Sequence, residues 1–152
     1  MNFLNKKVLL TIGLLSFSNS VVGHVWTFTN LTLKPILIEF RLLTHSHVYY
    51  DVINPGENSS RFEWPLGSMK AGFCADKFFV SELNDNHLRD IFGRAIFPTV
   101  AEIKHAIDDA PARAKMARIS KHTPAITMES PCDSHNFNVV NDGGKLTVVT
   151  KD

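Results

Sequence analysis

The sequence predicts a mainly β fold: a single-domain antiparallel β-sandwich of about seven strands, with a short helical insertion near residues 84–121. Short segments rich in β-branched and aromatic residues recur along the chain, and turn-forming residues separate them. Between two such β regions, the apolar residues change to a helical spacing. No internal repeat is present, and the length suits one domain.

The amino terminus has the three zones of a secretory signal peptide. Lys6 and Lys7 precede the apolar run VLLTIGLLSF at 8–17, and small residues follow it. An apolar run of about ten residues is too short to cross a membrane, which takes about twenty. We therefore expect residues 1–23 to be removed. The mature domain of residues 24–152 would then be secreted or periplasmic, without a transmembrane anchor.

The first half of the mature chain has the alternation typical of strands. In the segment PILIEFRLL, Ile36, Ile38, Phe40 and Leu42 share one face. The sequence NPGE at 54–57 is typical of a type II turn, because proline fixes φ and the following glycine accepts a positive φ. The segments expected to form strands are 25–32, 35–43, 47–53, 61–64 and 72–83.

Two further strands are expected at the carboxyl end. Residues 135–140 and 145–150 flank the sequence NDGG, whose aspartate and glycines allow the positive φ angles of a tight hairpin turn. Phe137 would then share a face with Leu146 and Val148 across the pair.

The segment between these β regions carries helix signals. NDNHLRDIFG begins with an Asn or Asp cap and stops at Gly93. Thr99 and Glu102 have the spacing of a capping box, so a second helix is expected to begin there. Pro111 breaks or restarts this helix, and the basic segment ARAKMARISK at 112–121 follows.

The overall charge is close to zero. The chain has a formal charge of +1, and loss of Lys6 and Lys7 with the leader would make it −1. Such a balance gives no electrostatic reason to expect nucleic acid as a partner. The sequence contains no nucleophile elbow and no glycine-rich phosphate loop. It therefore favours a binding or interaction module, with an unknown protein or carbohydrate as ligand, over an enzyme.

Four aromatic residues could form a surface for such a ligand. Tyr49, Tyr50, Phe62 and Trp64 fall on strands expected to be neighbours, and flat exposed rings can stack on a sugar. Large rings in a sandwich more often fill the core, which is the alternative for all four.

A secreted copper protein is an alternative function. If the leader ends at Gly23, the mature chain begins with His24, and an amino-terminal histidine can hold copper together with a second histidine. Lytic polysaccharide monooxygenases have such a site on a secreted β-sandwich, and this chain resembles them only in that first residue. His45 and His47 lie two apart, a spacing that puts both on one side of a strand and could share a metal. Neither has a carboxylate or cysteine nearby, so we expect no resident cofactor and no stoichiometric copper.

A third alternative is a membrane-active or host-directed secreted factor. Its basis is the helical insertion, where four cations surround a short apolar stripe at 112–121. A solvated helix face explains the same pattern. Asn30 and Asn58 lie in glycosylation sequons, which matter only in a eukaryotic secretory route.

We predict that the mature protein lacks residues 1 to about 23, because the leader is cleaved on export. The intact mass of the exported form tests this and shows whether His24 is the first residue, since Ser18 and Ser20 also suit a cleavage site. A mass that includes Met1 would contradict export, and any other start than His24 would remove the basis for copper binding.

We predict that Cys74 and Cys132, the two cysteines of the chain, form a disulfide in the oxidising compartment. The bond would close a loop of nearly sixty residues, for which chain entropy gives a stabilisation of about 4 kcal/mol. Two buried free thiols are the alternative. Non-reducing peptide mapping should find one linked pair of peptides, whereas titration of two free thiols per chain would rule the bond out.

Overall fold

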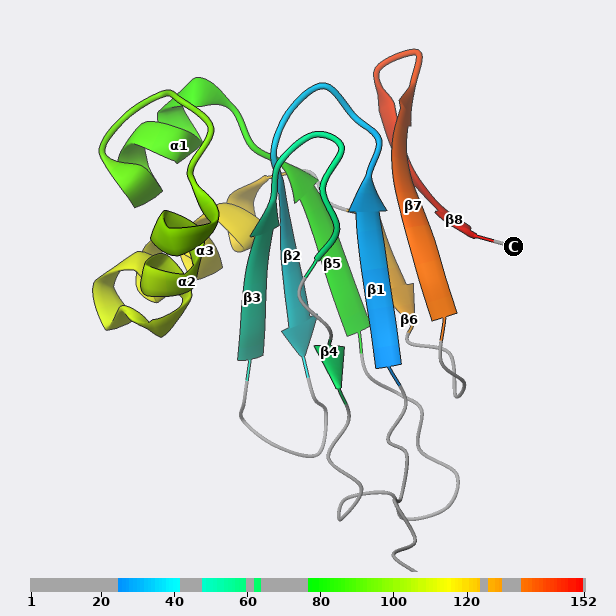
Figure 1. Cartoon of the computed structure of the whole chain (residues 1–152), viewed down its shortest axis with the longest axis horizontal. Helices are drawn as coiled ribbons and strands as arrows, with labels where there is room; N and C mark the ends of the chain where they lie inside the picture. Colours follow the sequence, from blue (N-terminus) through cyan, green and yellow to red (C-terminus); the bar gives the residue numbers. More distant parts are fainter. Residues whose placement is uncertain are drawn as a thin grey trace, which may run out of the picture.

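The computed structural model describes residues 25–41, 48–59, 62–63, 77–123, 126–129 and 135–151. The strands are β1 (Val25–Asn30), β2 (Ile36–Arg41), β3 (Val48–Ile53), β4 (Phe62–Glu63), β5 (Lys77–Glu82), β6 (Ile126–Glu129), β7 (His135–Asp142) and β8 (Lys145–Thr150). The helices are α1 (Asp85–Phe92), α2 (Val100–Asp108) and α3 (Ala110–His122). The helices follow one another between β5 and β6 and group on one side of the strands (Figure 1).

The strands form two open sheets. The first sheet has the order β4-β1-β7-β8, and the second has the order β3-β2-β5-β6. Every described pair is antiparallel except β1 with β7, which run parallel with Phe28 opposite Phe137. The prediction of an antiparallel sandwich is therefore wrong for the first sheet, which is mixed. β1 and β7 are far apart in the sequence, so no short hairpin dictates their relative direction.

An apolar core lies between the two sheets. Phe28 of β1 stacks on Phe137 of β7 with ring centroids 5.1 Å apart, and it meets Phe78 of β5 edge-on at 4.9 Å. Leu146 and Val148 of β8 pack against this core, as the hairpin pattern predicts. The buried members include the predicted face of β2 and are Trp26, Phe28, Ile36, Ile38, Phe40, Ile53, Phe78, Val80, Phe137 and Val139.

The helices cover the outer face of the second sheet, and a second apolar cluster joins them to it (Figure 1). Leu37 and Val52 contribute from the sheet, Ile103 contributes from α2, and Met116 of α3 is fully buried. The molecule thus has three layers, with the second sheet covered on both faces. Because the helices form a complete layer, the fold class is α/β rather than mainly β.

Local sequence signals place the ends of the helices. Asn84 caps α1, and Gly93 ends it with a φ of 75° that favours glycine. Thr99 and Glu102 make the predicted capping box of α2. Asp109 caps α3 directly after α2 ends, and a proline stands in its first turn. The helices occupy the segment where the sequence predicts a helical insertion.

Two predicted turns are confirmed. In NPGE, the Glu57 amide donates to the Asn54 carbonyl at 3.1 Å, and Gly56 has a φ of 79°. In NDGG, Gly143 and Gly144 have φ angles of 58° and 87° and join β7 to β8.

Asn30, at the end of β1, is fully buried and well hydrogen-bonded. Its Nδ2 donates to the carbonyls of Lys34 and Ile53, both at 2.8 Å, and its Oδ1 accepts from the Thr32 amide at 2.9 Å. The Gly56 amide donates to the Asn30 carbonyl at 2.7 Å. Asn30 therefore ties the first sheet to the β1–β2 loop and to the end of β3. Its sequon is inaccessible in the folded chain.

We predict that Asn30→Ala lowers the free energy of unfolding by about 2–4 kcal/mol, because the three hydrogen bonds between its side chain and backbone groups are lost. Asn58→Ala is the matched control, since Asn58 is exposed and its side chain accepts a bond from Thr29 Oγ1. Urea unfolding measures both variants. Equal stability of the two variants would contradict a structural role for the Asn30 amide.

Candidate functional site

The two sheets leave a cleft of about 460 Å³ at one end of the molecule. It lies between the β7–β8 hairpin of the first sheet and the ends of β5, α3 and β6. Its walls offer a carboxylate, an amide, a hydroxyl, an ammonium group and two apolar side chains, which belong to Glu82, Asn141, Thr123, Lys145, Ile126 and Leu146.

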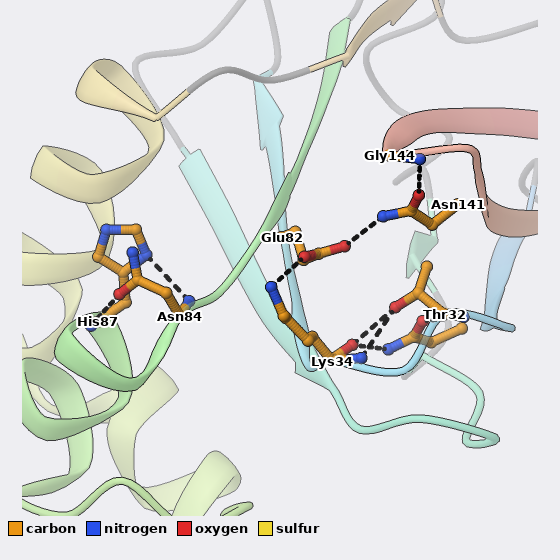
Figure 2. A network of polar contacts seen from close by, with 8 residues as sticks. Thr32, Lys34, Glu82, Asn84, His87, Asn141 and Gly144 are labelled. Atoms are coloured by element: carbon orange, nitrogen blue, oxygen red, sulfur yellow. Dashed lines mark hydrogen bonds and ion pairs between the residues drawn. The ribbon is translucent and has the colours of Figure 1, made fainter.

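Asn141 is positioned by the hairpin turn itself. Its Oδ1 accepts from the Gly144 amide at 2.9 Å, which leaves Nδ2 free to donate to Glu82 Oε2 at 2.9 Å. Figure 2 shows this path from Gly144 through Asn141 to Glu82. The second bond joins the hairpin of the first sheet to the last residue of β5 in the second sheet.

Glu82 also pairs with Lys34 of the β1–β2 loop, with 3.0 Å between Nζ and Oε1. Burial disfavours ionisation of Glu82, but hydrogen bonds from Lys34 and Asn141 outweigh burial and hold the pKa of the carboxyl below its ordinary value. Glu82 is therefore a carboxylate at neutral pH. Each of its oxygens has one partner and keeps a lone pair for another donor.

The loop that carries Lys34 is itself held by hydrogen bonds. Thr32 Oγ1 donates to the Lys34 carbonyl at 2.8 Å, and the Lys34 amide donates to Thr32 Oγ1 at 3.3 Å (Figure 2). Asn30 holds the same carbonyl from the other side. Two distant segments, the β1–β2 loop and the β7–β8 hairpin, thus hold the Glu82 carboxylate of β5, which makes it a fixed acceptor in the cleft wall.

Asn84 and His87, the other pair in Figure 2, serve the start of α1 rather than the cleft. Asn84 Oδ1 accepts from the His87 amide at 2.9 Å, and the Asn84 amide donates to His87 Nδ1 at 3.4 Å. Burial lowers the pKa of His87 although nearby Asp90 opposes this, so the ring is neutral at pH 7.

The expected leader 1–23 lies outside the described residues, and so do the residues that the sequence singles out for a metal site or a disulfide. The latter are His24, His45, His47, Cys74 and Cys132. Trp64 and Leu42 also lie outside, and Phe62 is described only as backbone of β4. The roles assigned to them stay predictions.

The two tyrosines do not share a face. Tyr49 is 46% exposed, and its ring centroid lies 6.4 Å from that of Phe40. Tyr50 is only 8% exposed and belongs to the cluster beneath the helices. In addition, β3 and β4 lie in different sheets. The structure therefore does not bring Tyr49 and Tyr50 to one surface, because consecutive residues of a strand point to opposite sides. A ligand-binding role of the four rings stays a prediction.

The basic residues of α3 are largely used within the fold. Arg113 Nη2 donates to the Val48 carbonyl at 3.0 Å, Lys115 Nζ donates to the Asp90 carbonyl at 2.6 Å, and Arg118 pairs with the Asp90 side chain. These contacts fasten α3 to α1 and β3, so they do not favour membrane contact through this helix. In the part of the chain that the structure describes, no helix has the length and apolar character to cross a bilayer.

The described ranges contain no group of three or more His, Cys, Asp or Glu side chains arranged to hold a metal ion. The histidines in these ranges lie on separate elements, at His87 in α1, His105 in α2, His122 in α3 and His135 in β7.

Sequence reasoning missed most of the cleft. Lys34 and Glu82 are separated by 48 positions, and no local pattern marks either as part of a site. Asn141 lies in the predicted NDGG turn, which locates it at a hairpin tip but does not reveal its partner. The NDGG turn was thus the one local sequence pattern that located a residue of this network.

No family model matches the chain, and comparison with curated proteins and with solved structures returns no significant match. The case for a function therefore rests on the geometry and chemistry of the chain's own residues.

Proposed function

We propose that this protein is an exported, non-catalytic binding module that holds a hydroxyl-rich ligand, a carbohydrate, in the cleft between its sheets. The scaffold consists of two sheets and a helical layer, and the leader-like first 23 residues support export. The observation that carries the proposal is the Glu82–Asn141 hydrogen bond, which fixes a carboxylate and an amide side by side in the cleft wall.

The cleft combines the groups that a sugar needs. Sugar hydroxyls both donate and accept hydrogen bonds, so they can donate to Glu82 and accept from Lys145, while Thr123 can do either. Ile126 offers an apolar contact for the C–H surface of the ring. The volume of about 460 Å³ lies in the range of small-molecule sites. Because Glu82 and Asn141 are already held in place, binding would cost little side-chain ordering.

We predict that a panel of mono- and disaccharides contains a ligand whose amide shift changes map to the cleft, and that Glu82→Gln weakens its binding about tenfold. The amide keeps the shape of the side chain but loses the charge that makes carboxylate hydrogen bonds strong. Titration of the isotope-labelled mature chain by NMR measures both effects.

Two further variants sharpen this experiment. Asp108→Asn removes an exposed carboxylate that does not line the cleft, so it should leave the affinity unchanged. Thr123→Ala alters the cleft wall without touching the Lys34–Glu82–Asn141 network. Thermal unfolding checks that each variant is folded. If no sugar perturbs the cleft, or if Glu82→Gln and Thr123→Ala both bind like the parent chain, the proposal is wrong.

A membrane surface is the second candidate, because two loops expose large apolar side chains. Leu31 and Leu33 lie in the β1–β2 loop, where Leu33 is 91% exposed. Ile96, Phe97 and Val100 are exposed in or beside the α1–α2 loop, and both loops lie at the upper end of the molecule in Figure 1. Sedimentation with zwitterionic lipid vesicles separates the two functions. Co-sedimentation without any sugar binding would favour this second candidate.

A further inference from the structure

A second cavity, of about 340 Å³, lies between the edge strand β3 and the first turns of α3. It shares no lining residue with the cleft at Glu82. Two polar side chains, Tyr50 and Arg113, line it together with three apolar ones from Val48, Ala110 and Ala114.

Arg113 is a positioned cation at this cavity. Its Nη2 donates to the Val48 carbonyl at 3.0 Å, which holds the guanidinium at the edge of β3. The other N–H groups of Arg113 have no partner among the described residues. A guanidinium has five donors in a planar fork that matches a carboxylate, so most of its capacity is free for a ligand.

Tyr50 brings an unpartnered hydroxyl to the same cavity. The residue is 8% exposed, and within the described ranges its hydroxyl has no hydrogen-bond partner. Burial, followed by the negative charge of Glu39, raises the pKa of Tyr50, although Arg41 and Arg113 oppose the shift. The hydroxyl therefore stays protonated at neutral pH and can act as a donor. Although the residue as a whole is buried, this oxygen is not among the buried polar atoms without a partner, so it is open to the cavity and accessible to a ligand.

The charges around the cavity favour a monovalent anion. Glu39 lies directly opposite Tyr50 in the β2–β3 register and is 1% exposed. Its Oε1 accepts a hydrogen bond from Arg41 Nε, so these two charges largely cancel. Asp109 already occupies the positive end of α3. Among the residues that line the cavity, Arg113 thus supplies the positive charge for a ligand. Its single charge balances the one negative charge of a carboxylate, but not the two of a phosphate.

We propose that this cavity binds the carboxylate of a short aliphatic acid. Arg113 pairs with the carboxylate, Tyr50 donates a hydrogen bond to it, and Val48, Ala110 and Ala114 contact the aliphatic part. The site is independent of the cleft between the sheets, so its failure would leave the proposed function untouched.

Hexanoate is the probe, added to the isotope-labelled mature chain and followed by NMR. We expect saturable amide shifts at Val48, Ala110 and Ala114 and none at the cleft. Arg113→Gln should weaken binding about tenfold or more, since a charge-assisted pair is lost, and Tyr50→Phe about threefold. Arg118→Gln is the matched control, because Arg118 lies on the same helix but pairs with Asp90.

Neutral and divalent analogues test the chemistry of the site. 1-Hexanol should bind at least tenfold more weakly than hexanoate, and inorganic phosphate should not displace hexanoate. Thermal unfolding shows whether each variant is folded. If Arg113→Gln does not fold, the hexanoate affinity of Tyr50→Phe is the deciding measurement. Equal affinity for 1-hexanol and hexanoate would overturn the proposal. So would full displacement by phosphate, or unchanged hexanoate affinity in every folded variant of Arg113 and Tyr50.

Discussion

The buried amide of Asn30 is the interaction on which the cleft end of this protein depends. It binds the Lys34 carbonyl in the β1–β2 loop and the Ile53 carbonyl at the end of β3 with the same nitrogen. The loop is therefore fixed at its turn, and Lys34 can reach Glu82 across from it. Without that anchor, the ion pair would have to order a free loop, and the entropy of ordering exceeds what an exposed pair contributes.

Glu82 and Glu39 are two carboxylates in different environments. Glu82 sits at the cleft, where Lys34 and Asn141 each hold one oxygen. Glu39 is buried in the second sheet, where Arg41 binds Oε1 and Oε2 has no partner. Only the Glu39 side of this ion pair is buried, and the missing partner of Oε2 offsets part of what the pair contributes to stability. Its charge instead acts on the neighbouring Tyr50, whose hydroxyl it helps to keep protonated.

The cavity at Arg113 exists because the helical layer packs beside the edge strand β3. β2 contacts the inter-sheet core through Ile36, Ile38 and Phe40 and the helices through Leu37, so it is covered on both faces. α3 crosses the end of β3, where Arg113 binds the Val48 carbonyl. This contact also covers part of an edge strand that would otherwise offer an unpaired carbonyl for association.

The sequence by itself determined the local elements. Alternation marked the inner face of β2, the NPGE and NDGG turns followed from the φ angles that proline and glycine permit, and the Thr99–Glu102 spacing marked the start of α2. These signals act within a few residues, so they can be recognised without the fold. Only the tertiary structure decided that β1 and β7 are parallel and that the helices form a full layer. It also decided that Glu82 meets Asn141, because hydrogen bonds between distant segments form only once packing has aligned both partners.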